Sequence, residues 1–199
     1  MTVSTAHSPD AVARVLSRAF QQDPLFRHFF PEDRRRADAS FFTFRFLVAH
    51  ARARGVIQTP ADALHGAAVW LPSGHMHRSV VDMLRFGAAR MVPHQGLGAV
   101  RRQIQASDHM QALHDQLIRE PHWYLSLLGV DPGQQGRGQA TVLLHPMLEQ
   151  ADRKQQICFL DTHNADNVSL YQRFGFRVEH EGIMPNSTVR HWAMRRDPR

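Results

Sequence analysis

The feature that most constrains the fold is an alternation of strand and helix patterns over the last 80 residues. Short apolar runs bounded by turn residues predict strands, and apolar residues at helical spacing predict the helices between them. The expected strands are 123–130, 157–160, 176–179 and 189–194, and a helical turn or two covers 167–174. The helix expected between the strands 123–130 and 157–160 carries an apolar face at i, i+3, i+4, i+7, i+8 and i+11. This face is formed by Ala140, Leu143, Leu144, Met147, Leu148 and Ala151. This order predicts an α/β layer with at least one parallel pair of strands.

The first 119 residues are predicted to be mainly helical. Ser8 and the residues after it read as a capped amphipathic helix that Asp23-Pro24 ends. A second, phenylalanine-rich helix is expected over Asp33–Arg54, and an antiparallel hairpin over 55–59 and 64–71. The pattern is helical again from 78 to 119, with an interruption at 93–98. The sequence contains no internal repeat or linker, so we expect one domain over residues 1–199.

The charge balance does not by itself indicate a nucleic-acid partner. The chain has 24 Lys+Arg against 18 Asp+Glu, for a net charge of +6, and Lys154 is its one lysine. The arginines are spread along the chain, which favours solvated helix faces over a polyanion site. No apolar run approaches the roughly 18–20 residues that a membrane span needs. The start, Met1–Arg14, lacks a signal-peptide core, and a single cysteine excludes a disulfide framework. We therefore expect a cytoplasmic protein without membrane or nucleic-acid partners.

The segment Gln135–Ala140 lies between a predicted strand and the amphipathic helix. A helix start presents unpaired N–H groups and a partial positive charge, and glycines let the backbone approach a phosphate closely. A Walker loop is excluded because Gln139-Ala140 stands where Lys-Ser/Thr is required. A dinucleotide fingerprint, with Asp161 as its ribose acid, remains an alternative, although only about 60 residues follow, too few for the rest of a doubly wound sheet.

Gln135, Gly138 and Ala140 fit the pattern Gln-x-x-Gly-x-Gly/Ala, and a second motif follows in Asn167-Val168-Ser169-Leu170-Tyr171 and Phe174-Gly175-Phe176. The two motifs at this spacing resemble the GNAT acyltransferase superfamily, and residues 120–196 resemble puromycin N-acetyltransferase and its relatives in particular. The resemblance implies the GNAT acyl-CoA N-acyltransferase fold, a mixed central sheet with helices on both faces. Residues 1–119 would supply acceptor-side helices and the first hairpin, and residues 120–199 the acetyl-CoA-binding half.

The resemblance also implies where acetyl-CoA binds. The loop residues Gln135, Gly136, Arg137, Gly138, Gln139 and Ala140 would hold its diphosphate. Leu128, Gly129 and Val130, at the end of the preceding strand, would pair with the pantetheine arm, and Asn167 would hold a pantetheine amide. We expect Gly129 to mark a bulge that frees backbone groups for this pairing. Otherwise Gly129 would be a loosened strand end and Asn167 a helix cap.

The catalytic assignments follow the same resemblance. Tyr171 would be the general acid, since a phenol is suited to protonating a leaving thiolate. Histone-acetyltransferase relatives carry a glutamate base where this chain has Tyr124, so that assignment does not transfer. Asp161, His122 and His163 remain candidate bases, and a water chain could serve instead.

Two other chemistries are not expected. Cys158 stands among apolar residues and reads as part of the core rather than as a nucleophile. Fourteen histidines raise the question of a metal, but there is no His-Glu-x-x-His motif, and His75 and His77 share a loop without an acidic ligand. No metal is predicted. The leading hypothesis is an acetyl-CoA-dependent N-acetyltransferase for a small-molecule amine, monomeric or homodimeric. The alternative is a non-catalytic acyl-CoA-binding or sensing module on the same fold.

Overall fold

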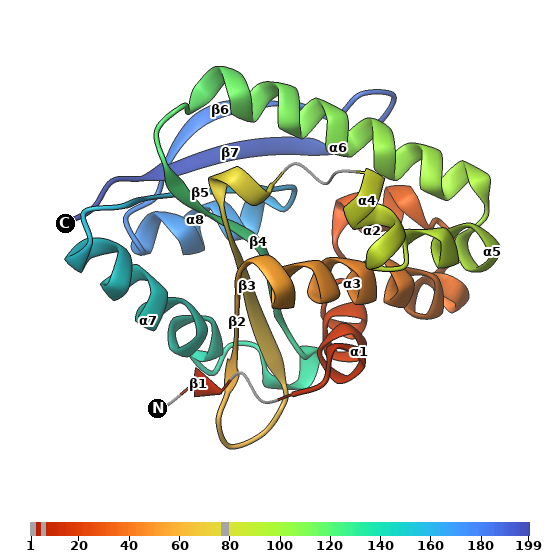
Figure 1. Ribbon diagram of the computed structural model, residues 1–199, viewed down its shortest axis with the longest axis horizontal. Helices are drawn as coiled ribbons and strands as arrows, with labels where there is room; N and C mark the ends of the chain where they lie inside the picture. The colour runs from red at the N-terminus through yellow and green to blue at the C-terminus, as the bar shows by residue number, and fades with distance from the viewer. Residues whose placement is uncertain (1–2, 5–6, 77–79) are drawn as a thin grey trace.

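A seven-stranded sheet of order β1-β2-β3-β4-β5-β7-β6 forms the centre of the computed structural model (Figure 1). The strands are β1 (Val3–Ser4), β2 (Val56–Pro60), β3 (Gly66–Pro72), β4 (His122–Val130), β5 (Ile157–Thr162), β6 (Arg177–Ile183) and β7 (Arg190–Arg196). The structure describes residues 3–4, 7–76 and 80–199. His77 and the expected helix start at 78 lie outside these ranges.

Eight α-helices surround the sheet in the described ranges, with short 3₁₀ turns between some of them. They are α1 (Pro9–Ala19), α2 (Pro24–Phe29), α3 (Asp33–Arg54), α4 (Val80–Arg85), α5 (Met91–Gln95), α6 (Leu97–Leu117), α7 (Gln139–Arg153) and α8 (Ala165–Arg173). None of the described helices is both long enough and apolar enough to span a bilayer.

Two neighbouring strands of the sheet, β4 and β5, pair over only part of their length. Every neighbouring pair is antiparallel except β4 and β5, which run parallel and are joined through α7. The parallel pairing covers only His122–Leu125 against Ile157–Leu160. Beyond Leu125 and Leu160 the two strands separate, and we call this opening the fork. Each strand stays paired on its other side, β4 with β3 and β5 with β7, so the sheet as a whole is continuous.

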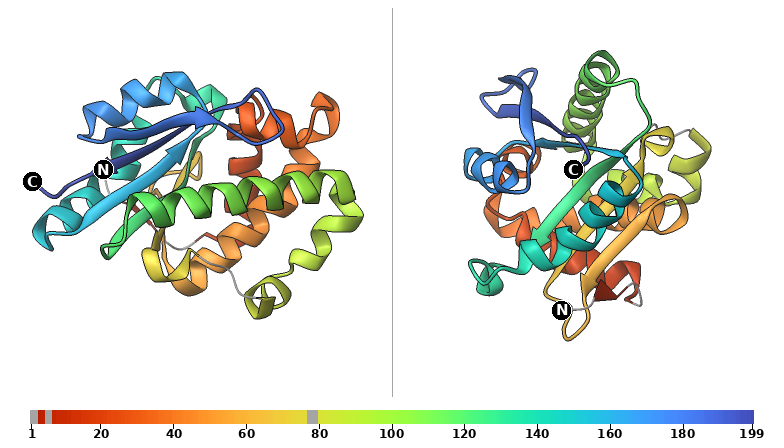
Figure 2. Two further views of the ribbon diagram at one scale, coloured as in Figure 1. Left: turned by 90° about the horizontal axis from the view of Figure 1, so that it is seen from above. Right: turned by 90° about the vertical axis from the view of Figure 1, so that its left-hand side faces the viewer.

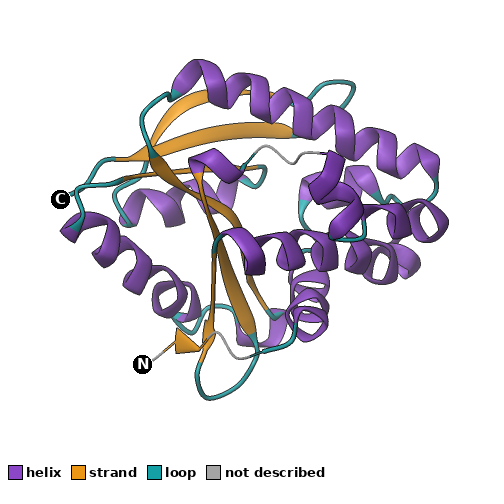
Figure 3. Cartoon of the chain, viewed as in Figure 1, coloured by secondary structure: helices purple, strands orange, loops and turns teal. Residues whose placement is uncertain are grey.

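Helices cover both faces of the sheet (Figures 2 and 3). On one face, α7 and α8 bury their apolar sides in a cluster that includes Leu143, Leu144 and Tyr171. On the other face, α1, α2 and α3 pack an aromatic cluster over β3 and the end of β4. Helix α6 covers β5 and β7 on that same face through a smaller cluster around Phe159. The predicted mixed sheet with helices on both faces is confirmed.

The region around Asp23 differs from the prediction. The first helix ends at Ala19, and Asp23-Pro24 begins α2 rather than merely stopping the helix before it. The Asp23 carboxylate accepts the N–H groups of Leu25 and Phe26, and proline at the first helical position needs no partner for a missing N–H. The helical region after residue 78 is likewise divided, with Gly87 and Gly96 in positive-φ conformations at the breaks before α5 and α6.

Candidate active site

The loop that enters α7 is built as an open anion site. Gly136 and Gly138 adopt φ values of 74° and 75°, a left-handed conformation that disfavours other residues. A Cβ added to either glycine would meet nothing within 4 Å, so close packing is not the reason for glycine at these positions. Gly138 is the N-cap of α7 and offers no side-chain cap. The first N–H groups of this 15-residue helix are therefore available to an anion.

The side chains of the loop fit the same purpose. Arg137 is exposed, and its Nη1 lies 3.4 Å from Gln134 Oε1, a weak contact that leaves the guanidinium able to reach an anion. Gln135 donates through Nε2 to the carbonyl of Val130 at 3.0 Å, which ties the loop to the end of β4. Gln139 and Ala140 are the first two residues of α7.

Backbone groups of β4 face the fork beside this loop. The Val130 carbonyl accepts from Gln135, whereas the peptide N–H that follows Val130 donates to His65 O, before β3, at 2.7 Å. Backbone groups alternate between the two edges of a strand. The C=O and N–H groups of Leu128 and Val130 therefore point to the fork, where β5 has separated, and those of Gly129 point to β3.

The bulge predicted at Gly129 lies elsewhere in β4. Gly129 pairs regularly with Ala67, and the register shifts at Ser126, the extra residue between the paired Leu125 and Leu127. A Cβ on Gly129 would lie 2.8 Å from Leu16 Cδ2 and 3.1 Å from the Cβ of Ala19, so glycine is needed there for α1 to approach the strand. The bulge at Ser126 coincides with the start of the fork.

Tyr171 lies on the α7–α8 face at the fork. Its ring is buried, in edge contact with Phe176 at 5.8 Å, in the same apolar cluster as Leu143 and Leu144. Burial, and in second place the Asp23 carboxylate, raise the pKa of Tyr171, so the phenol stays protonated at neutral pH.

Asp23 is a site residue that the sequence analysis missed. It lies between α1 and α2 on the opposite face from α8, and its charge contributes to the raised pKa of Tyr171. Burial raises the pKa of Asp23 to about 6, although hydrogen bonds from the N–H groups of Phe26 and Leu25 oppose this rise. The dipeptide Asp23-Pro24 was visible in the sequence, but as a helix boundary.

Asp161 is the first residue of β5 beyond the last pair with β4. Its side chain is only 4% exposed and lies on the α6 face. Tyr124 donates its hydroxyl to Asp161 Oδ2 at 2.9 Å, and His191 Nε2 lies 2.6 Å from Oδ1. Sequence reasoning missed His191 because only the register of β7 beside β5 brings it to Asp161.

The other predicted side chains lie in different places. His122 begins β4 at the closed end of the β4–β5 pair and contacts His114, with 2.8 Å between the two Nε2 atoms. His163 follows β5 and stacks on His191 with ring centroids 5.1 Å apart. Cys158 is fully buried, and burial raises the pKa of its thiol to about 12, which suits a core residue.

Asn167 lies in the first turn of α8 and does not cap it. The cap is Asn164, whose side chain accepts the N–H of Asp166 at 3.1 Å. The side chain of Asn167 has no hydrogen-bond partner among the described residues. The part of the chain that the structure describes holds no group of three or more His, Cys, Asp or Glu side chains arranged for a metal ion.

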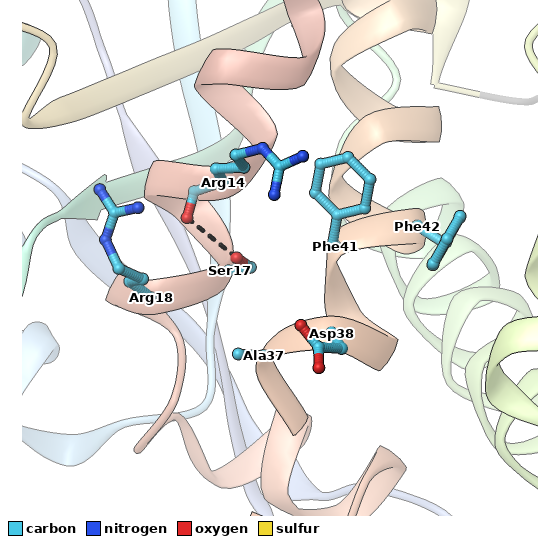
Figure 4. A pocket seen from close by; sticks show the side chains of 7 residues that line it. All are labelled: Arg14, Ser17, Arg18, Ala37, Asp38, Phe41 and Phe42. Carbon is cyan, nitrogen blue, oxygen red and sulfur yellow. Dashed lines mark hydrogen bonds between the residues drawn. The ribbon is translucent and has the colours of Figure 1, made fainter. Parts of the chain in front are cut away.

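A hollow of about 440 Å³ lies between α1 and α3 (Figure 4). It is lined by Arg14, Ser17, Arg18, Ala37, Asp38, Phe41 and Phe42. Arg14 stands over the Phe41 ring at 5.0 Å, and Arg18 points toward Asp131, with which it forms an ion pair. Its lining contains none of the residues placed at the fork or in the glycine loop.

Comparison with known proteins agrees with this geometry. Residues 88–176 match the model of the acetyltransferase (GNAT) family. The chain is 22% identical to a solved acetyltransferase of Corynebacterium glutamicum described as histone acetyltransferase HPA2 and related acetyltransferase, over 100% of this chain and 96% of that one, with a TM-score of 0.69. These matches support assignment of the chain to the GNAT superfamily of acetyltransferases.

Two further relatives are more distant in sequence or in coverage. The chain is 14% identical to arylalkylamine N-acetyltransferase 2 of Aedes aegypti, with a TM-score of 0.61 over 100% of this chain and 98% of that one. It is 25% identical over 139 residues to an uncharacterised N-acetyltransferase of Schizosaccharomyces pombe. That match covers 67% of this chain and 55% of the yeast protein, so the chain spans about half the length of this curated relative.

Proposed function

We propose that the chain transfers an acetyl group from acetyl-CoA to a primary amine of a small molecule. The observation that supports this proposal is that Tyr171 packs in one apolar cluster with Leu125 and Leu160, the last paired residues of β4 and β5, and with Leu143 of α7, the helix that the glycine loop enters. GNAT membership supports acetyl transfer as the class of reaction. The names of two structural neighbours, an arylalkylamine and an agmatine N-acetyltransferase, support an amine acceptor.

The residues present fit the coenzyme. The N–H groups of Gln139 and Ala140, the glycines 136 and 138, and Arg137 would hold its diphosphate, with Gln135 fixing the loop. The backbone groups of Leu128 and Val130 would pair with its pantetheine arm as a strand pairs with its neighbour, and the unpartnered amide of Asn167 would hold a pantetheine amide. When bound there, acetyl-CoA supplies the acetyl group as a thioester.

Tyr171 is proposed as the general acid that donates a proton to the leaving sulfur. The raised pKa of Tyr171 keeps this proton in place at neutral pH. Across the fork, the Asp23 carboxylate would attract the ammonium form of the acceptor. Asp161 remains a proposed base because it lies at the fork. His122 is a weaker candidate, since four residues at about 3.3 Å each separate it from Ser126, where the fork begins.

The test is incubation with acetyl-CoA and a panel of primary amines that includes 2-phenylethylamine and agmatine. We expect release of free thiol with at least one amine, together with saturable binding of the coenzyme. Absence of both coenzyme binding and thiol release would contradict the proposal.

A second candidate function rests on Tyr124, which stands where catalytic relatives of the histone-acetyltransferase type carry a glutamate base. A non-catalytic acyl-CoA-binding module would bind acetyl-CoA in the same assay and release no thiol with any amine. A wild-type rate above that of acetyl-CoA hydrolysis alone would exclude this alternative.

A further inference from the structure

A cluster of imidazoles surrounds Asp161 on the α6 face, and the proposed function does not use it. We call His109, His163, His180 and His191 the histidine cluster. His191, on β7, is its centre: the ring centroids of His163, His109 and His180 lie 5.1, 5.9 and 6.3 Å from that of His191. The rings come from four segments, α6, the loop after β5, β6 and β7, so the fold rather than local sequence assembles them.

The hydrogen bond to Asp161 fixes which nitrogen of His191 is free. A carboxylate can only accept, so at 2.6 Å from Asp161 Oδ1 it is Nε2 of His191 that carries the proton. In the neutral ring Nδ1 is then a lone-pair acceptor. The side chain of His191 is 0% exposed, and its Nδ1 is buried with no hydrogen-bond partner among the described residues. His163 Nε2 is a second buried nitrogen without a partner there.

Such an arrangement is complementary to a cation. A carboxylate that holds one imidazole nitrogen raises the basicity of the other and stabilises the imidazolium that forms, as in carboxylate–histidine pairs of hydrolases. Burial, as the main cause, lowers the pKa of His163 to about 3 and also lowers that of His109, so these two rings are neutral at pH 7. Tyr124 completes the surroundings by donating to the other oxygen of Asp161. A protonated amine would supply the hydrogen-bond donor that the unpartnered Nδ1 of His191 lacks.

The cluster also lies at the open end of the fork. Asp161 is the first β5 residue past the last pair with β4, and His191 is the second residue of β7, directly after the β6–β7 turn. Met184 and Val189, at the two sides of that turn, belong to the aromatic cluster of α1, α2 and α3. These contacts hold His191 and Asp161 beside the same helices that border the fork.

We propose that His191, held through Nε2 by Asp161, receives the ammonium group of the acceptor and removes its proton. This inference rests on the proposed function. The proton passes from the ammonium nitrogen to His191 Nδ1, directly or through one water, and leaves a neutral amine and an imidazolium paired with Asp161. The amine lone pair forms the new C–N bond as the C–S bond breaks, and the sulfur takes its proton from Tyr171. The proton that the amide nitrogen then loses restores the Tyr171 phenol through water, and the imidazolium later returns its own proton to water beside His109 and His180.

The first experiment replaces the titratable ring and keeps a hydrogen-bond donor for Asp161. His191→Gln should lower kcat at pH 7 by about 100-fold, within the usual range for loss of an acid–base group, and remove the acidic limb of the pH–rate profile. The affinity for acetyl-CoA should stay within threefold of wild type. His145→Gln, on the exposed face of α7, is the matched control and should change neither.

The second readout does not depend on turnover. In protein with ¹⁵N-labelled histidine rings, His191 should be the Nε2–H tautomer at pH 8, and Asp161→Asn should shift its ring resonances. Adding 2-phenylethylamine should perturb the Nδ1 resonance of wild type.

The outcomes separate the two proposals. An unchanged pH profile in His191→Gln, or a protonated Nδ1 at pH 8, overturns the role of His191 while acetyl transfer stands. A wild type that acetylates no amine overturns the proposed function, and the role of His191 falls with it. A loss of thermal stability in His191→Gln with no change in the pH profile shows a structural role only and also overturns the inference.

Discussion

The two faces of the sheet meet at the fork with different chemistry. On the α7–α8 face, the groups at the fork and the loop beside it are backbone N–H groups, glycines and the phenol of Tyr171. On the α1–α6 face, the same opening is bordered by charged or titratable side chains, namely Asp23 and the Asp161–His191 pair. The difference indicates that one face recognises a ligand through main-chain geometry and the other through side-chain charge. Substitutions on the two faces should therefore separate coenzyme binding from acceptor chemistry.

The sharpest test of this division is Tyr171→Phe. The phenol lies on the α7–α8 face, which is proposed to bind the coenzyme, but its proposed role is proton transfer rather than binding. We expect kcat to fall by at least about 100-fold, the usual lower range for loss of a general acid. The affinity for acetyl-CoA, measured by calorimetry, should change less than threefold, since the ring still packs on Phe176. Equal losses in kcat and affinity would contradict the acid role.

A substitution of Arg36 tests how the helices α1, α2 and α3 are stabilised on the α1–α6 face. Its guanidinium is buried and donates to the carbonyls of Gln21, Phe30 and Pro31, on either side of α2. Arg36→Met leaves these buried acceptors without a charged donor and should lower the free energy of unfolding by about 3 kcal/mol in urea titrations. Arg35→Met, at an exposed neighbour, should cost less than about 0.5 kcal/mol. A similar loss of unfolding free energy at both positions would show that the hydrogen bonds of Arg36 do not stabilise α2.

Asp23 gives a pH test of the same face. Its pKa is raised to about 6 in the folded chain, above the ordinary value near 4, so the folded state binds more protons between these values. The contribution of Asp23 is therefore present below about pH 4 and is lost as pH rises to 6, by about 2 kcal/mol. Asp23→Asn should remove this slope from the free energy of unfolding measured between pH 4 and 7. An identical slope in both proteins would mean that Asp23 titrates normally.

The smallest expected effect is on the coenzyme face. Gly138→Ala puts a side chain at φ 75° beside the first N–H groups of α7, at a strain cost of about 1 kcal/mol. The dissociation constant for acetyl-CoA should rise by about fivefold to tenfold, with kcat at saturation unchanged. Gly133→Ala is the control, because Gly133 has no positive φ and open space around it. A similar loss in the control would contradict a specific role for the loop geometry.

The coenzyme half could be predicted from sequence because its signals are local. The apolar face of α7, the glycine loop and the motif around Tyr171 each lie within one element and its turn. The family assignment followed from these motifs, and the narrower resemblance to puromycin N-acetyltransferase stays a prediction.

The acceptor face could not be predicted in the same way, because its site depends on contacts between distant elements. The position of Asp23 follows from the way α1 packs on β4, and His191 meets Asp161 only through the register of β7. Helix α2 has six residues and begins at a proline, and β1 has two residues, so neither gives a periodic pattern. The bulge predicted at Gly129 was wrong because a strand glycine often marks a bulge, whereas this glycine lets α1 approach the strand closely.

The contact between Gly129 and α1 also sets a dimension of the molecule. Adding one methyl group at this glycine would force Leu16 and Ala19 outward, and the turn that carries Asp23 follows directly after them. The position of the turn that carries Asp23 therefore depends on the absence of a side chain at Gly129. A larger residue at this position would move α1 and the turn after it away from the strand.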